Sequence, residues 1–180
     1  MSSAFKILPR YTYDDYCNWE GNWELIEGIP YAMSPLPIPK HQAIANNLGA
    51  ELRFALKKCK ACRSYQPIDY KINEETVVGP DLLVVCKEIK KKYLDFPPEL
   101  VAEITSPATE FKDRYTKFEL YQQQKIKYYL LISPEAEEVE IYLFQNDAYK
   151  LQQKGGNLAY TFAFTGCTAT IDFAEVFTDL

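Results

Sequence analysis

Two short and almost continuous apolar runs constrain the fold of this chain more than any other feature of its sequence. They are Asp81–Cys86, which reads Asp-Leu-Leu-Val-Val-Cys, and Pro98–Ile104, which reads Pro-Glu-Leu-Val-Ala-Glu-Ile. Such runs are typical of central β-strands that are covered on both faces. Residues 40–58 and 107–124 instead carry apolar side chains at spacings of three and four, which predicts helices. We therefore expect one α/β or α+β domain over residues 1–180, with helices flanking a mixed sheet.

Weaker patterns predict strands toward both ends of the chain. Trp23–Glu27 and Ile29–Met33 flank Gly28 and predict an N-terminal hairpin. A further strand region is predicted near residues 63–73. Short apolar runs between residues 127 and 164 are separated by turn residues, which predicts a C-terminal β-meander.

Composition and charge exclude several classes of protein. Apolar residues make up 47% and charged residues 25% of the chain, which argues against disorder. No apolar run approaches the roughly 18 residues that a membrane span needs. The N-terminus lacks the apolar segment of a secretory signal, so we expect a cytoplasmic protein. The net charge of -5 argues against tight, sequence-independent binding of nucleic acid, although basic residues are concentrated in residues 40–71.

The five cysteines are an odd number in a chain that carries no secretory signal. We expect ordinary packed thiols rather than a disulfide framework. Cys59 and Cys62 have C-x-x-C spacing with basic neighbours, which leaves a redox or metal role open as the alternative. Because there is no second C-x-x-C and only one histidine, His41, no familiar spacing supplies four zinc ligands.

Three charged residues on consecutive elements remain as candidates for chemistry, since phosphate-loop, dinucleotide, zinc-protease and serine-hydrolase motifs are absent. Asp81 begins one apolar strand, Glu103 interrupts the next, and Lys117 lies in the following helix. Neighbouring strands are about 4.8 Å apart, so two carboxylates from them can share one cation. Each residue also has a structural interpretation: a turn at Asp81, an ion pair at Glu103, and an exposed salt bridge between Lys117 and Asp113.

The order of these residues resembles the Uma-two family, a group described as restriction endonucleases within the PD-(D/E)xK nuclease superfamily. The resemblance covers nearly the whole chain and rests on Pro80-Asp81, Val101–Pro107, Asp113–Lys117, Tyr121, Trp23–Gly28, Ser34-Pro35 and His41. It implies a restriction-endonuclease-like core, a mixed four-stranded sheet flanked by helices.

The resemblance also implies a role for each residue of the site. Asp81 and Glu103 would bind Mg²⁺ or Mn²⁺, and Lys117 would orient the attacking water and stabilise charge at the phosphate. The plain motif places its lysine two residues after Glu103, where this chain has Thr105. The lysine therefore corresponds to Lys117 on the next helix.

Two accessory residues complete the predicted site. His41, at the start of the first long helix, could approach the metal, or it could be a histidine at the edge of the core. Glu27 lies among apolar neighbours and is a weaker candidate, with a hairpin-turn position before Gly28 as its alternative. A further set of basic residues could contact a phosphate backbone or simply face solvent: Lys57, Lys58, Lys60, Arg63, Lys87 and Lys90–Lys92.

The sequence thus favours a metal-dependent endonuclease that hydrolyses phosphodiester bonds in DNA. Cutting both strands with one small site would favour a homodimer. The alternative from another class is a non-catalytic nucleic-acid-binding or protein-interaction module on the same fold. A two-carboxylate glycosidase ranks below both, because the chain is small for that class.

Overall fold

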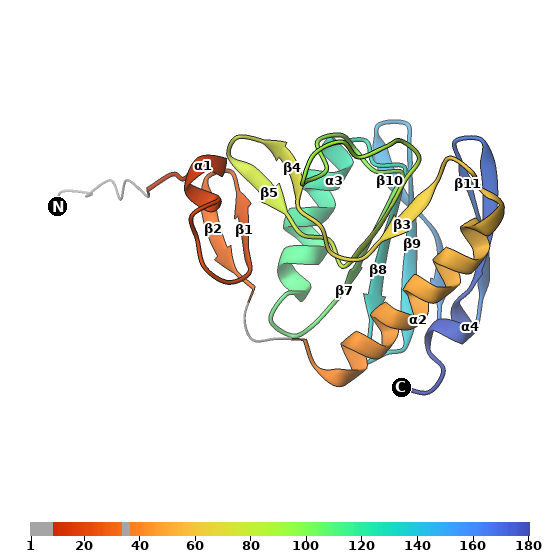
Figure 1. Ribbon diagram of the computed structural model, residues 1–180. Helices are drawn as coiled ribbons and strands as arrows, with labels where there is room; N and C mark the ends of the chain where they lie inside the picture. Colours follow the sequence, from red (N-terminus) through yellow and green to blue (C-terminus); the bar gives the residue numbers. More distant parts are fainter. Residues whose placement is uncertain (1–8, 34–36) are drawn as a thin grey trace.

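A six-stranded mixed sheet is the centre of the fold in the computed structural model, which describes residues 9–33 and 37–180 (Figure 1). Residues 1–8 and the Ser34-Pro35 pair of the family resemblance lie outside the described residues. In spatial order the strands are β10 (Ala148–Gly155), β9 (Glu138–Gln145), β8 (Tyr128–Ser133), β7 (Leu100–Ile104), β6 (Leu82–Val85) and β3 (Arg63–Tyr65). Strands β7 and β8 run parallel and all other neighbours antiparallel, so the predicted mixed sheet is confirmed.

The N-terminal hairpin belongs to a second, four-stranded sheet. Its order is β2 (Ile29–Ala32), β1 (Trp23–Ile26), β5 (Thr76–Val78) and β4 (Tyr70–Asn73), preceded along the chain by the short helix α1 (Tyr13–Tyr16). The hairpin prediction is confirmed. The single strand region predicted near residues 63–73 is instead divided between the two sheets, as β3 and β4.

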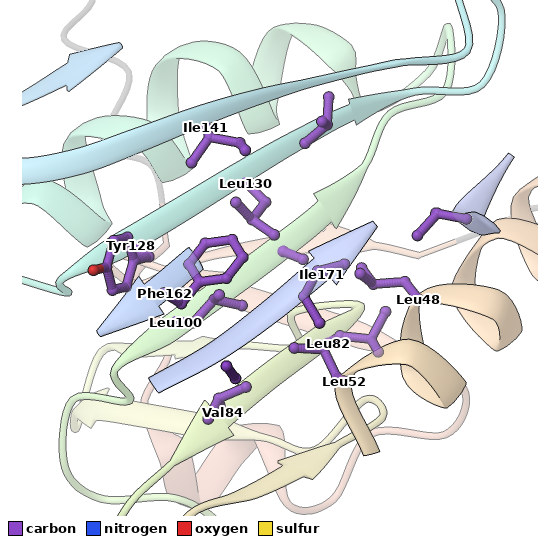
Figure 2. Close-up of a cluster of buried hydrophobic side chains, with 14 of the residues drawn as sticks. Leu48, Leu52, Leu82, Val84, Leu100, Tyr128, Leu130, Ile141, Phe162 and Ile171 are labelled. Carbon is purple, nitrogen blue, oxygen red and sulfur yellow. The ribbon is translucent and has the colours of Figure 1, made fainter. Parts of the chain in front are cut away.

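One face of the main sheet is covered by the long helix α2 (Pro39–Ala55), the 3-10 turn η1 (Leu56–Lys58) and the C-terminal elements (Figure 1). These last elements are β11 (Ala159–Phe164), β12 (Cys167–Asp172) and helix α4 (Phe173–Val176). Figure 2 shows how Leu48 and Leu52 of α2 meet Phe162 and Ile171 over the strands. This layer closes the larger of the two hydrophobic cores.

The predicted C-terminal meander holds only in part. Strands β8, β9 and β10 form an antiparallel meander in the main sheet, but β11 and β12 pair only with each other. Phe162 and Ile171 are fully buried, and both belong to the core beneath α2. The hairpin therefore buries its apolar face by packing over the sheet rather than by extending its edge.

The opposite face of the main sheet carries a π-helical segment, η2 (Lys112–Lys117), followed by α3 (Phe118–Gln123). The helix predicted from residue 107 begins later, because Pro107 lies in a turn. Alternation along β7 sends Ala102 to the core beneath α2 and Val101 to the core beneath α3. Glu103 shares the face of Val101, so it lies beneath η2 and α3.

The expectation of unpaired thiols is wrong for four of the five cysteines. Disulfides join Cys59 to Cys167 and Cys62 to Cys86, and only Cys17 is free. The partners are 108 and 24 residues apart in the chain. Their pairing depends on how β12 and β6 meet the end of α2, which local sequence spacing does not reveal.

No helix in the described part of the chain is long and apolar enough to span a membrane.

Candidate active site

The two predicted metal ligands lie opposite each other on neighbouring strands. Leu82 of β6 pairs with Ala102 of β7, so the antiparallel register places Asp81 across from Glu103. The backbone N–H of Ile104 donates to Asp81 Oδ2 over 2.7 Å. Glu103 is 2% exposed, whereas the Asp81 side chain is 23% exposed. The strand register thus brings the pair together with one carboxylate buried and the other open to solvent.

Lys117 reaches this pair from the helical layer above the sheet. Its Nζ lies 3.0 Å from Glu103 Oε1 and 2.7 Å from Glu24 Oε1. The i+4 partner Asp113 is farther away, at 3.6 Å from Nζ, and both side chains are buried. The exposed salt bridge that sequence spacing offered as the structural interpretation is therefore absent, because the π-helical segment directs Lys117 inward.

Glu24 is a member of the site that the sequence reasoning missed. It lies on β1 and is fully buried, and its Oε1 also accepts a hydrogen bond from the backbone N–H of Gly79 over 3.0 Å. Lys112 Nζ lies 2.5 Å from its Oε2. The signal that could have found Glu24 is the one used for Glu103, a carboxylate inside an otherwise apolar strand.

Glu27, the acidic residue that was chosen from this hairpin, does not join the others. It occupies the turn between β1 and β2 with a φ of 51°, and it is exposed. The turn interpretation therefore describes Glu27. Six residues make up what we call the carboxylate–lysine cluster: Glu24, Asp81, Glu103, Asp113, Lys112 and Lys117.

Burial and like charge shift the carboxylates of this cluster in opposite directions. Burial raises the pKa of Glu103 well above its usual range, and Asp113, Asp81 and Glu24 add to the shift that Lys117 only partly offsets. Burial would also raise the pKa of Glu24, but Lys117 and Lys112 outweigh it and hold that pKa below normal. Glu103 is consequently the carboxylate that most lacks positive charge.

Lys117 remains an ammonium group despite complete burial. Burial alone would lower its pKa, but the charges of Glu103, Glu24 and Asp113 raise it well above the ordinary lysine value. A group in this state donates hydrogen bonds and supplies positive charge. It does not take up a proton, so Lys117 is not a general base in this arrangement.

Hydrogen bonds to the two metal-ligand candidates engage one oxygen of each. Tyr121 Oη donates to Glu103 Oε1 over 2.6 Å, the same oxygen that Lys117 contacts. Both contacts leave Oε2 of Glu103 for another ligand. His41 Nε2 lies 3.4 Å from Asp81 Oδ2, the oxygen already bonded to Ile104. Each carboxylate is thus oriented through one oxygen and presents a second.

His41 therefore contacts the site through Asp81. Burial lowers the pKa of His41, but its hydrogen bond and charge interaction with Asp81 outweigh that effect and raise it overall. Its Nδ1 is buried without a hydrogen-bond partner among the described residues. This geometry suits a residue that positions Asp81 from the start of α2.

The donor set fits a small divalent cation. Four carboxylates face two ammonium groups in the carboxylate–lysine cluster, which leaves two negative charges without a partner. Carboxylate oxygens are the ligands that Mg²⁺ prefers, and it is commonly held by one or two of them together with phosphate oxygens and water. No three His, Cys, Asp or Glu side chains in the described residues form a ready metal site by themselves. Two protein ligands, Asp81 and Glu103, are what the arrangement offers.

The basic residues considered for phosphate contacts are dispersed over the surface. All of them are exposed, namely Lys57, Lys58, Lys60, Arg63, Lys87, Lys90, Lys91 and Lys92. Lys91 pairs with Asp95 over 2.7 Å, as expected for a solvated face.

Comparison with known proteins agrees with this arrangement. Residues 11–170 match the model of the Uma2 family, whose description is "Putative restriction endonuclease". An uncharacterized protein of Synechocystis sp., slr1290, is 30% identical over 149 residues, which cover 78% of this chain and 77% of the relative. The crystal structure of a putative nuclease of family DUF820 from Anabaena variabilis matches with a TM-score of 0.74 at 17% identity, covering 93% of this chain and 97% of that one.

The solved structure confirms the restriction-endonuclease-like fold expected from the sequence, with helices on both faces of a mixed sheet. The family match extends from α1 through most of β12 and so includes every residue of the carboxylate–lysine cluster. This chain belongs to the Uma2 family of restriction-endonuclease-like nucleases.

Proposed function

We propose that the protein is a Mg²⁺-dependent endonuclease that hydrolyses phosphodiester bonds in DNA, with Mn²⁺ as an alternative metal. The observation that carries this proposal is the convergence of Asp81, Glu103 and Lys117 from three separate elements. A binding module would have no need to bury Lys117 among carboxylates, since such an arrangement costs several kcal/mol unless the charges are used or compensated.

Asp81 and Glu103 would hold the cation through the oxygens that protein donors leave free. When bound, Mg²⁺ polarises the scissile phosphate and lowers the pKa of its water. His41 and the Ile104 N–H keep Asp81 oriented, and Tyr121 does the same for Glu103.

Lys117 replaces the lysine that is missing at residue 105. Thr105 is buried and its hydroxyl donates to the Ile132 carbonyl over 3.2 Å, so it has a structural role. Glu24 holds the Lys117 ammonium group beside Glu103. From there Lys117 orients the attacking water and stabilises negative charge that develops on the phosphate.

Exposed aromatic rings beside the cluster support a nucleic-acid substrate. Phe111 and Tyr115 are 74% and 58% exposed, and their ring centroids are 4.8 Å apart. They flank Lys112 and Asp113 on the helical segment that carries Lys117. Aromatic side chains near a phosphate-cleaving site provide surfaces on which bases can stack.

The test is cleavage of supercoiled and single-stranded DNA with Mg²⁺ or Mn²⁺ by the wild type, Glu103→Gln and Lys117→Ala. We expect metal-dependent nicking that is lost in both variants. Absence of cleavage on both substrates with both metals would contradict the endonuclease proposal. Cleavage that survives Glu103→Gln would contradict the assignment of the site.

We also propose that the enzyme acts as a homodimer, because cutting both strands of a duplex with one small site requires two copies. Sedimentation at the concentration that gives double-strand cleavage tests this point. A monomer under those conditions would refute it.

A further inference from the structure

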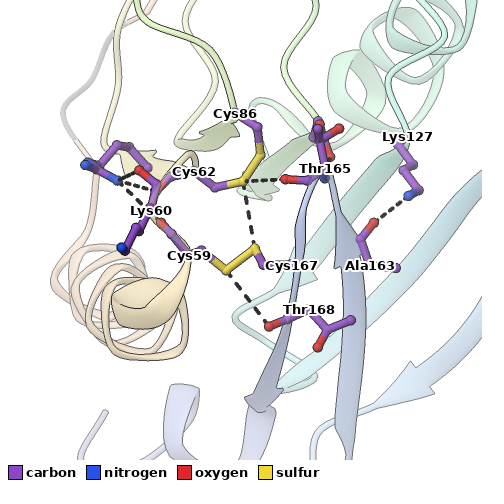
Figure 3. The surroundings of a disulfide bond; sticks show 11 residues. Cys59, Lys60, Cys62, Cys86, Lys127, Ala163, Thr165, Cys167 and Thr168 are labelled. Carbon is purple, nitrogen blue, oxygen red and sulfur yellow. Dashed lines mark hydrogen bonds between the residues drawn. A yellow bond between two sulfur atoms is a disulfide. The ribbon is translucent and has the colours of Figure 1, made fainter.

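Four cysteines gather at one place on the face of the sheet opposite Glu103. Cys59 follows η1, Cys62 precedes β3, Cys86 follows β6, and Cys167 begins β12. They are joined pairwise as two disulfides, and Figure 3 shows these bonds side by side. Cys167 Sγ lies 3.9 Å from Cys62 Sγ, across the two pairs. The four sulfurs thus form a single cluster rather than two separate cross-links.

Strand register and loop structure create this cluster. Arg63 pairs with Val85, so the antiparallel register of β3 and β6 places Cys62 beside Cys86. The turn between β11 and β12 brings its own backbone to the same place, with the Thr165 carbonyl 3.7 Å from Cys62 Sγ.

The loop that carries Cys59 and Cys62 is held by a side chain as well as by the disulfides. The Arg63 guanidinium donates to the backbone carbonyls of Lys60 and Cys62 over 3.0 and 2.9 Å, with a longer contact of 3.5 Å to that of Cys59. These bonds do not depend on the oxidation state of sulfur. The loop therefore keeps its shape when the cysteines are thiols.

Four thiolates at such a place are the ligand set of a structural zinc site. One C-x-x-C loop supplies two ligands and two other strands supply one each, a common division in such sites. A Zn–S distance of about 2.3 Å and tetrahedral angles separate two sulfurs on one zinc by about 3.8 Å. The 3.9 Å between Cys62 and Cys167 matches this separation.

The charge around the cluster also suits thiolate ligands. Zinc with four thiolates carries two negative charges, and the flanking exposed residues are cations, namely Lys57, Lys58, Lys60, Arg63 and Lys87. Nearby cations lower the pKa of a thiol and favour its thiolate form. These residues have no other ligand in the proposed nuclease mechanism.

We propose that in its thiol form the chain binds one Zn²⁺ ion through Cys59, Cys62, Cys86 and Cys167. In this reaction four thiols release four protons and form four sulfur–zinc bonds, with no change in oxidation state. The bound ion joins the β11–β12 hairpin to the end of α2 and to the edge strand β3, as the disulfides do in the oxidised form. The site does not depend on the proposed nuclease activity.

The experiment is a Co²⁺ titration of the full-length chain, freed of metal and kept reduced by a phosphine. A thiol count after denaturation verifies that all five cysteines are reduced. We expect a thiolate-to-cobalt charge-transfer band that saturates at one equivalent and disappears when Zn²⁺ is added. Cobalt bound at carboxylates gives no such band, so the readout is independent of the Asp81–Glu103 site.

Cys17→Ser is the matched control, because Cys17 is exposed and unpaired, and it should titrate like the wild type. Cys167→Ser and Cys62→Ser should each lose the tetrahedral signature and bind at least tenfold more weakly. If Cys62→Ser does not fold, the wild type and Cys167→Ser still decide the question. A folded, reduced wild type without the band would overturn the proposal, as would an unchanged band in Cys167→Ser.

Discussion

Two glutamates lie in one row of the main sheet and have opposite electrostatic fates. Glu103 of β7 pairs with Leu131 of β8, which in turn pairs with Glu140 of β9, so all three side chains point to the same face. Both glutamates meet a basic residue of η2, Lys117 for Glu103 and Arg114 for Glu140. Yet the pKa of Glu103 is raised well above its usual range, whereas that of Glu140 is lowered.

The neighbours of each glutamate explain the difference. Burial would raise the pKa of Glu140, but hydrogen bonds from Arg114, Tyr142 and Lys154 outweigh it. Glu103 shares its only nearby cation, Lys117, with two other carboxylates. A carboxylate in an apolar strand is therefore ambiguous. Glu140 is a satisfied ion pair, whereas Glu103 lacks positive charge that a cation could supply.

The largest effect on stability should come from the shared lysine. Lys117→Met should lower the free energy of unfolding by about 3–5 kcal/mol, because it leaves buried carboxylates without their ammonium partner. Arg114→Met is the matched control on the same helical segment, where Glu140 retains Tyr142 and Lys154, and it should cost about 1 kcal/mol or less. Urea unfolding without metal measures both, and equal losses would show that the two clusters are alike.

The next effect concerns activity. Glu103→Gln should reduce metal-dependent cleavage by about 10²–10³-fold, because an amide cannot replace an ionic ligand beside the phosphate. Glu140→Gln should leave the cleavage rate within about twofold of the wild type. Initial rates of plasmid nicking compare the two variants. A comparable loss in both would remove the distinction between a catalytic and a structural carboxylate.

Opposite pKa shifts predict opposite pH dependence of stability in the absence of metal. The ordinary pKa of a glutamate is 4.5. The lowered pKa of Glu140 means that its stabilising effect is present above pH 4.5 and is lost as the pH falls below it. The raised pKa of Glu103 means that stability decreases as the pH rises above 4.5.

Relative to the wild type, Glu140→Gln should therefore be less stable at neutral pH, with the difference narrowing in acid. Glu103→Gln should instead become relatively more stable as the pH rises. Unfolding midpoints between pH 4 and 8 test both trends. Differences of the same sign for the two variants would contradict the assigned shifts.

The smallest effect is expected at the exposed aromatic pair. Phe111→Ala should raise the KM for single-stranded DNA several-fold, equivalent to about 1 kcal/mol of base stacking, with little change in kcat. Phe54→Ala is the control, since Phe54 is equally exposed but lies on α2, on the other face of the sheet. Equal effects of the two substitutions would mean that Phe111 has no special relation to the substrate.

The sequence predicted the main sheet and the pair Asp81–Glu103 because both depend on local patterns. Apolar runs identify central strands, and alternation assigns Glu103 to the face of Val101. Glu24 was missed because its role depends on how β1 and Gly79 pack against η2, a contact between segments 55 and 88 residues apart. Glu27 was chosen instead, since nothing local shows which carboxylate of a hairpin points inward.

The cysteines show the same limit of local spacing. Cys59 and Cys62 were visible as a C-x-x-C pair, but their partners come from β6 and β12. Only the folded arrangement shows that the four sulfurs meet. The β11–β12 hairpin likewise could not be placed from its own alternation, because packing over the sheet and extending its edge both bury one apolar face.

Isothermal titration with Mg²⁺ and Mn²⁺ tests most directly whether the Asp81–Glu103 pair is the metal site. The comparison uses the wild type, Glu103→Gln, Asp81→Asn and Glu140→Gln, all with the cysteines oxidised. We expect binding by the wild type and Glu140→Gln, and at least tenfold weaker binding by the other two. Equal binding by all four proteins, or none by the wild type, would contradict the metal site.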